Sequence, residues 1–219
     1  MIFVNFKTFQ GGTGQRAISL IKIIEDVAQS SGVKIIPAVQ ASDVREAVSS
    51  TKLEIWTQKI DAVGFGAHTG SILPEAVYED GAAGTFLNHS EAKIGDLRVL
   101  KAAVSRAGEV GLKTLVFASD ARELAQVVAL KPTFASYEPP ELIGSRETSV
   151  AQAHPDIISQ ASEICKNSGV PLIVGAGVHS GQDVKKSLEL GAVGVALAID
   201  VVAAQDPRAE LLDLVEGFK

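Results

Sequence analysis

The feature that most constrains the fold of this chain is a repeated joint between a helix-like stretch and a short apolar run. Glycine stands at five such joints, at Gly32, Gly81, Gly111, Gly169 and Gly191. Glycine tolerates the left-handed conformation that commonly ends a helix. The runs that follow are apolar and often β-branched, as in strands that helices cover on both faces. The chain is therefore predicted to alternate helix and strand.

Amphipathic stretches separate the runs, with apolar residues at spacings of three and four. Their stripes comprise Ala17, Leu20, Ile21, Ile24 and Ala28; Leu97, Leu100, Val104 and Ala107; and Ile157, Ile158, Ala161, Ile164 and Cys165. Because Cys165 belongs to a stripe, core packing is expected for it rather than nucleophilic catalysis. Ser180, followed three residues later by Asp183, is predicted to cap the start of a later helix.

Eight strands are predicted, near residues 2–6, 33–37, 54–58, 84–88, 112–117, 133–137, 171–174 and 193–197. Strands that alternate with helices form a parallel sheet. Eight such units indicate an α/β fold with a closed (β/α)₈ barrel, in which the helices after strands two and three are short. The length of 219 residues suits one domain, here 1–219. Residues 59–73 are predicted to form a long loop, and such loops are usually functional or interfacial.

Reactive side chains follow three of the predicted strands. Asn5 and Lys7 end the first, His89 and Glu91 follow the fourth, and Glu138 follows the sixth. Active sites of such barrels lie at the carboxyl ends of the strands. An amine, an imidazole and a carboxylate would thus meet at one mouth, where they can move a proton next to a carbonyl without a cofactor.

Each of these residues also has a structural interpretation. Lys7 could be a surface lysine, and His89 a loop residue or helix cap. Glu91 could stabilise the first turn of a helix. Glu138 could be an ion-pair partner. If His89 instead begins the helix after strand four, the helix amides are expected to lower its pKa and keep the imidazole neutral.

No metal or dinucleotide site is predicted. The histidines are too widely spaced for common zinc patterns and stand at His68, His89, His154 and His179. The segment 175–181 contains G-x-G without the full G-x-G-x-x-G spacing. We therefore expect no metal and no cofactor.

The overall charge and the single cysteine restrict partners and compartment. The formal net charge is −6 with dispersed basic residues, which argues against nucleic-acid binding. The one cysteine excludes a disulfide within the chain. No apolar run approaches the length of a membrane span, and the first residues lack the pattern of a secretory leader. A cytoplasmic location without membrane contact is expected.

The strand-end segments resemble the triosephosphate isomerase family. They read Asn5-Phe6-Lys7, Asn88-His89-Ser90-Glu91 and Glu138-Pro139-Pro140-Glu141-Leu142-Ile143-Gly144, followed by Gly175-Ala176-Gly177-Val178. Their order and spacing are similar to the short, archaeal-type branch of that family, from Asn5 to about Pro207. The resemblance implies a TIM barrel that interconverts dihydroxyacetone phosphate and D-glyceraldehyde 3-phosphate through an enediolate.

The family's residue roles carry over to matching positions. Glu138 would be the base, and His89 and Lys7 would stabilise the enediolate with help from Asn5. Glu91 would support them from behind. The resemblance further implies a small phosphorylated triose as substrate. It also implies a homo-oligomer, a tetramer or alternatively a dimer, with loop 59–73 reaching the neighbouring subunit.

The resemblance also implies a lid after Glu138 and a seat for the substrate phosphate. The expected phosphate-binding residues are Ile143, Gly144, Ser145, Gly175, Ala176, Gly177, Ala198 and Ile199. Two positions depart from the family pattern. Arg146 replaces a hinge glycine of the lid, and Asp200 puts a carboxylate near the phosphate seat. We expect the Asp200 side chain to turn away and cap the short helix after strand eight.

Two other functions remain open on the sequence. One is a different phosphosugar isomerase or epimerase on the same barrel, although neither a metal-ligand set nor paired strand-end aspartates are present. The other is a barrel that binds a phosphorylated ligand without turnover, since Arg146 and Asp200 alter the usual loops.

Overall fold

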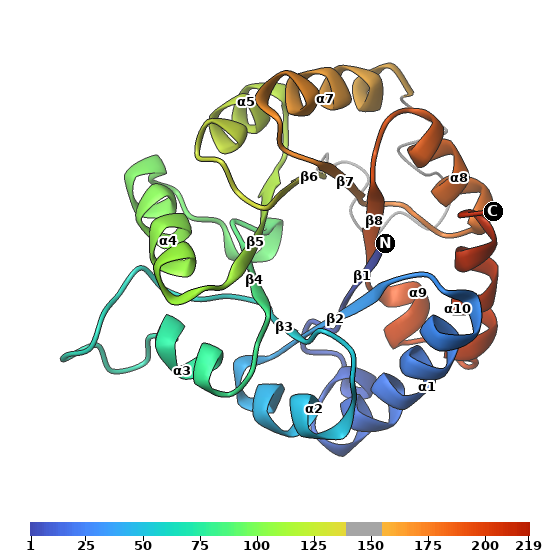
Figure 1. Ribbon diagram of the computed structural model, residues 1–219, viewed down its shortest axis with the longest axis horizontal. Helices are drawn as coiled ribbons and strands as arrows, with labels where there is room; N and C mark the ends of the chain where they lie inside the picture. The colour runs from blue at the N-terminus through green and yellow to red at the C-terminus, as the bar shows by residue number, and fades with distance from the viewer. Residues whose placement is uncertain (139–154) are drawn as a thin grey trace.

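Eight parallel strands close into a barrel in chain order, and the last strand pairs with the first (Figure 1). The computed structural model describes residues 1–138 and 155–219. Its strands are β1 (Ile2–Asn5), β2 (Ile35–Val39), β3 (Trp56–Thr57), β4 (Gly84–Leu87), β5 (Lys113–Ala118), β6 (Phe134–Tyr137), β7 (Leu172–Gly175) and β8 (Gly194–Leu197). The predicted TIM barrel is confirmed.

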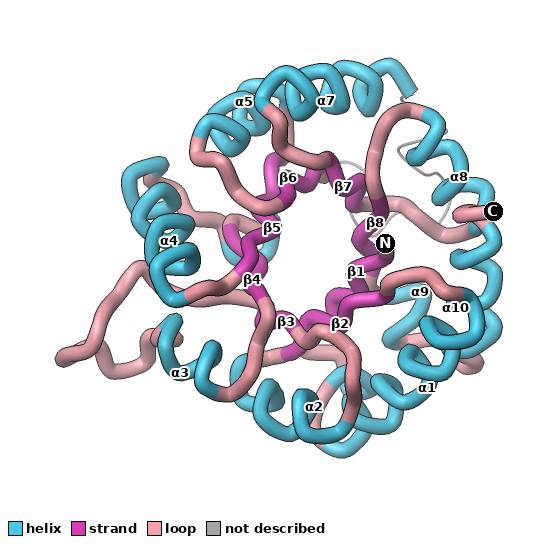
Figure 2. Tube along the Cα trace, in the orientation of Figure 1, coloured by secondary structure: helices cyan, strands magenta, loops and turns pink. Residues whose placement is uncertain are grey.

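Helices surround the strands as an outer ring (Figure 2). In the described residues they are α1 (Gln15–Ser31), α2 (Val44–Ser50), α3 (Pro74–Glu79), α4 (Leu97–Val110), α5 (Ala121–Ala129), α7 (Pro155–Ser168), α8 (Gly181–Glu189), α9 (Ile199–Val202) and α10 (Pro207–Glu216), with 3₁₀ turns η1 (Gln10–Gly12), η2 (Ala41–Asp43) and η3 (Ser90–Ala92). The expectation of short helices after β2 and β3 is confirmed. No helix in the described part of the chain is long and apolar enough to span a bilayer.

The glycine joints behave as the sequence predicts. All five adopt positive φ, and Gly32 and Gly111 close α1 and α4 with backbone bonds to the last helical turn. The predicted bounds are less accurate for β2, which begins two residues later than expected, and β3, which spans only two residues. Helix ends are marked by glycine, whereas strand ends depend on the register with neighbouring strands.

The core has two parts on opposite sides of the strands. Side chains alternate along each strand, so Phe3 faces the barrel interior while Val4 packs toward the helices. Aromatic rings fill the interior: Phe3 lies edge-on to Trp56 at a centroid distance of 5.0 Å, and Phe86 lies edge-on to Phe117 at 5.1 Å. Because side chains fill the barrel interior, the carboxyl ends of the strands are left as the place for a site.

The helical stripes are largely confirmed, with one error. Leu97 is 43% exposed, and the buried face of α4 is formed by Leu100, Ala103 and Ala107. Leu97 is the first residue of α4, directly after the cap Asp96, and the buried positions of the helix begin one turn later at Leu100. Ser180 caps α8 as expected, because its side chain accepts a hydrogen bond from the Asp183 N–H.

Residues 58–73 contain no helix or strand, and Figure 1 shows the segment before α3 projecting outward from the barrel. Asp61 joins the two ends of this loop: its carboxylate accepts the Ile72 N–H at 2.8 Å. Within the loop, Phe65 is 78% exposed. The loop is thus anchored at its base and presents an apolar side chain to the outside.

Candidate active site

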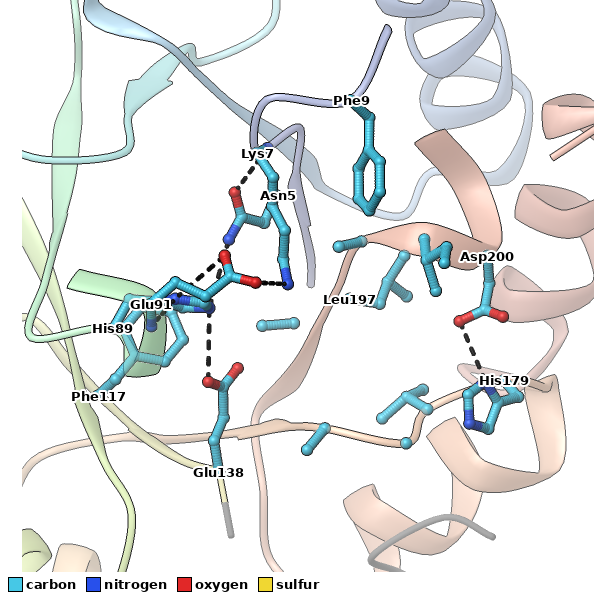
Figure 3. Close-up of a pocket in the computed structure, with 16 residues that line it drawn as sticks. Asn5, Lys7, Phe9, His89, Glu91, Phe117, Glu138, His179, Leu197 and Asp200 are labelled. Carbon is cyan, nitrogen blue, oxygen red and sulfur yellow. Dashed lines mark hydrogen bonds and ion pairs between the residues drawn. The ribbon is translucent and has the colours of Figure 1, made fainter. Parts of the chain in front are cut away.

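A cavity of about 280 Å³ opens at the carboxyl ends of the strands (Figure 3). Asn5, Lys7, His89, Glu91 and Glu138 all line it, although they come from three separate parts of the chain. The predicted convergence of amine, imidazole and carboxylate is therefore what the barrel produces.

The backbone after β1 positions Asn5 and Lys7. Lys7 has φ of 46°, and its N–H donates to the Asn5 Oδ1 at 3.0 Å. The Gln58 amide donates to the Lys7 carbonyl at 2.9 Å, a contact that the sequence did not suggest. The Lys7 Nζ lies 2.8 Å from the Glu91 carboxylate.

His89 follows β4 and caps the short turn η3. Its Nδ1 accepts a hydrogen bond from the Glu91 N–H at 3.2 Å, so Nδ1 carries no proton and the neutral ring bears its proton on Nε2. Burial, aided by the Lys7 charge, lowers the pKa of His89 to about 4. The neutral imidazole agrees with expectation. Its main cause is burial, because η3 is only a three-residue 3₁₀ turn rather than the start of a helix.

Asn88 supports His89 in a way that sequence reasoning missed. Its backbone is left-handed, with φ of 60°. Its amide donates to the Phe117 carbonyl at 2.8 Å and to Glu123 at 2.7 Å, while its Oδ1 accepts the Ile94 N–H at 2.9 Å. Three bonds from one side chain fix the turn that carries His89. Asparagine is among the few residues other than glycine that often adopt positive φ, and this was the available signal.

Glu138 directly follows β6, and its N–H donates to the Ala118 carbonyl of β5 at 2.9 Å. The residue is 7% exposed overall, and Oε2 is buried without a hydrogen-bond partner among the described residues. Desolvation raises the pKa of Glu138 to about 7. A carboxylate in this state is a stronger base than an ordinary glutamate.

Gly175 makes room for Glu138. A Cβ at this position would lie 2.3 Å from the Glu138 Oε1 and 2.5 Å from its Cγ, far inside contact distance. Gly175 is not part of the cavity wall, whereas the neighbouring Ala176 and Gly177 are. Gly175 thus lies against the base rather than in the lining.

The polar atoms point into one space. Asn5 Nδ2 and His89 Nε2 are 3.5 Å apart, and both are hydrogen-bond donors because Nδ1 of His89 is already the acceptor. Glu138 Oε2 lies 3.6 Å from the same Nε2. Two donors and a base around one point can polarise a carbonyl oxygen and remove a proton from the carbon beside it.

The opposite wall comes from the loops after β7 and β8. Ala176 and Gly177 both have positive φ, at 71° and 63°, and line the cavity with Ala198 and Ile199. The remaining expected phosphate ligands Ile143, Gly144 and Ser145, with the lid residues Glu141 and Arg146, lie outside the described residues.

The expectation for Asp200 is wrong. Asp200 lies inside α9, one residue after its start, and the N-cap position is Ala198, which forms no side-chain cap. Because the helix begins earlier than expected, the carboxylate cannot cap it. Asp200 Oδ2 instead lies 3.0 Å from His179 Nδ1, and both residues line the cavity. The sequence did not single out His179 as part of the site.

A family model described as "Triosephosphate isomerase" matches residues 1–217. The chain is 38% identical to a triosephosphate isomerase of Methanosarcina acetivorans, over 98% of this chain and 96% of that protein. It is 40% identical to the Methanothermobacter thermautotrophicus protein of the same name, over 98% and 94%. In the described residues, no group of three or more His, Cys, Asp or Glu could hold a metal ion.

Proposed function

The chain belongs to the triosephosphate isomerase family, and from this premise we propose how its residues interconvert dihydroxyacetone phosphate and D-glyceraldehyde 3-phosphate. The observation that carries the proposal is the cluster at the barrel mouth. There a buried carboxylate of raised pKa lies 3.6 Å from the Nε2 of a neutral imidazole.

Glu138 is the base in this proposal. It removes the proton from the carbon next to the carbonyl and returns it to the adjacent carbon. Its pKa of about 7 suits both steps, because the group can accept and release a proton near neutral pH. The space that Gly175 leaves keeps the carboxylate beside the cavity.

His89, Asn5 and Lys7 stabilise the enediolate. The Nε2–H of His89 donates to a substrate oxygen and exchanges protons with it, while Asn5 Nδ2 donates alongside. Lys7 supplies positive charge, and its bond to Glu91 holds the ammonium at the mouth. Donors already in place where negative charge develops cost little reorganisation in the transition state.

The substrate phosphate binds on the other wall. Backbone amides near Ala176, Gly177, Ala198 and Ile199 are the proposed ligands, supported by their place in the cavity lining. Ile143, Gly144 and Ser145 are proposed to complete the seat on the basis of the family resemblance. We assign Gly175 a steric role beside Glu138 in addition to the role expected from sequence.

The test is a coupled assay with glyceraldehyde 3-phosphate and purified protein. Conversion to dihydroxyacetone phosphate is the expected result. A different phosphosugar isomerase or epimerase would turn over another phosphosugar and not this one. A non-catalytic barrel would bind glycerol 3-phosphate in calorimetry and turn over neither.

The assembly and cellular location are further parts of the proposal. We propose a single barrel domain over 1–219 that forms a homo-oligomer, a tetramer or alternatively a dimer, in the cytoplasm. The projecting loop with its exposed Phe65 supports an interface. The single cysteine, Cys165, is buried and unpaired, which suits a reducing compartment.

A further inference from the structure

The charge of the cavity is poorly matched to a phosphorylated substrate. Its described lining carries one lysine and three carboxylates, Glu91, Glu138 and Asp200. Lys7 is already paired with Glu91. A phosphate monoester brings about two further negative charges at neutral pH. Without compensation, Asp200 would repel the substrate at the end where its phosphate is proposed to bind.

His179 contacts Asp200 and can become a cation. Its backbone N–H donates to the Asp183 Oδ2 at 3.1 Å, and its ring Nδ1 meets the Asp200 Oδ2 at 3.0 Å. Figure 3 shows this pair on the side of the cavity away from His89 and Glu91. Main chain and ring are thus each held by an aspartate, and the imidazole stays beside the Asp200 carboxylate.

The pair leaves one atom for an additional proton. A carboxylate can only accept, so the proton shared with Asp200 is on Nδ1, and a second proton would bind at Nε2. That Nε2 is buried and has no hydrogen-bond partner in the described residues. Buried polar atoms without partners are uncommon, and they often mark a catalytic role or the place of a water or an ion.

We propose that His179 and Asp200 form a charge-compensating pair at the phosphate end of the cavity. Binding of the phosphorylated substrate is accompanied by uptake of a proton from solvent at Nε2 of His179. The pair is then neutral, whereas with a neutral imidazole it carries the full charge of Asp200. This inference rests on the proposed function, which places the phosphate at the loops after β7 and β8.

The charged groups facing His179 come from several elements. Asp200 lies on α9 and Asp183 on α8, and Asp213 of α10 accepts the Gly181 N–H at 2.8 Å. Lys7 and Glu138 line the same cavity. The bound dianion adds to this largely negative field, and the added proton offsets part of it.

Separate measurement of KM and kcat in variants tests the pair. Glutamine at position 179 can still donate to Asp200 but cannot become a cation. His179→Gln is expected to raise KM for glyceraldehyde 3-phosphate about tenfold, equivalent to about 1.4 kcal/mol, with kcat unchanged. Adding Asp200→Asn should return KM to near the wild-type value. Asp26→Asn, which removes an exposed charge on α1, is the matched control and should change neither constant.

Proton uptake is the second readout. Glycerol 3-phosphate, which has no carbonyl to react, is titrated by calorimetry near pH 7 in two buffers of different ionisation enthalpy. The wild type is expected to take up more protons on binding than either His179→Gln or Asp200→Asn. Any uptake at Glu138 is common to all three proteins, so the difference reports the pair.

The outcomes separate the pair from the proposed function. An active wild type whose KM and proton uptake do not change in His179→Gln would overturn the pair alone. A rise in KM for Asp200→Asn by itself would also overturn it, because a purely structural contact would then explain both variants. If the wild type fails to isomerise the triose and still takes up more protons on binding than either variant, that result would support the pair and overturn the proposed function.

Discussion

Burial acts on two neighbouring side chains in opposite directions. It raises the pKa of Glu138 to about 7 and lowers that of His89 to about 4, because a buried site disfavours the charged form of each. Near neutral pH, Glu138 can therefore exchange a proton while His89 remains a neutral donor. The two roles follow from one physical cause acting on an acid and a base.

The position of the Glu138 carboxylate should matter more than its charge. Glu138→Asp keeps the charge and retracts it by a methylene group, about 1 Å, and such a misplacement can cost roughly 10²-fold in rate. We expect the loss mainly in kcat, measured by the coupled assay, with an unchanged circular dichroism spectrum. Turnover near the wild-type level would remove Glu138 from the role of base.

The acid-side loss of activity should follow Glu138. We expect kcat/KM to fall as pH decreases through about 7, the pKa of Glu138, because the protonated carboxyl cannot act as a base. His89 stays neutral down to about pH 4 and should add no inflection above that value. The profile is corrected for the titration of the substrate phosphate, whose second pKa is about 6. A corrected profile that is flat between about pH 6 and 8 would contradict the role of Glu138 as the base.

The same pKa shift should appear in stability. The folded-state pKa of Glu138 is raised from 4.5 to about 7, so its protonated form favours folding. That contribution is fully present below about pH 4.5 and is lost as pH rises through about 7. Glu138→Gln imitates the protonated group and should be more stable than wild type at pH 8, by on the order of 3 kcal/mol.

Urea denaturation at about pH 4.5 and 8 measures this difference, which should nearly vanish at the lower pH. Glu79→Gln, at an exposed position at the end of α3, is the matched control. If Glu138→Gln increased the free energy of unfolding equally at both pH values, a cause other than desolvation of the Glu138 carboxylate would explain the increase.

At the scale of elements, the base on β6 depends on the neighbouring strand β7. Gly175→Ala would place a methyl group 2.3 Å from the Glu138 Oε1, so the carboxylate must move. Because the contact is the end of a flexible side chain, we expect the fold to persist and kcat to fall roughly 10²-fold, as for other misplacements near 1 Å. The coupled assay and a thermal melt measure the two effects.

Gly108→Ala on α4 is the control for this substitution, because a Cβ there meets nothing within 4 Å. It should leave kcat unchanged, and alanine suits a helix better than glycine does. If Gly175→Ala retained wild-type kcat, Gly175 would not be the residue that sets the position of Glu138.

At the scale of the whole molecule, the projecting loop 59–73 is the expected oligomer contact. Analytical ultracentrifugation at micromolar concentration should show an assembly larger than a monomer. Phe65→Asp should weaken that assembly, since it would bury a charge in place of a side chain that is 78% exposed in the isolated chain. Leu212→Asp, an equally drastic change on α10, should not. A fully active monomer would rule out the interface.

The sequence alone determined the order of elements and the identity of the central residues. Glycines at the helix ends and alternating apolar residues act through local backbone preferences, so the barrel could be inferred before any contact was known. Alternation along β1 places Asn5 on the same inner side as Phe3. Asn5, Lys7, His89 and Glu138 then met at one mouth because all of their strands run parallel.

Only the tertiary structure decided how these groups are paired and charged. The fit of Glu138 against Gly175 and the contact of His179 with Asp200 join residues that are distant in the chain. Such distances depend on the register between strands and on the residue at which α9 begins, and no local propensity specifies them. Desolvation likewise depends on all the surrounding atoms, and for this reason the shifted pKa values of Glu138 and His89 emerge only in the closed barrel.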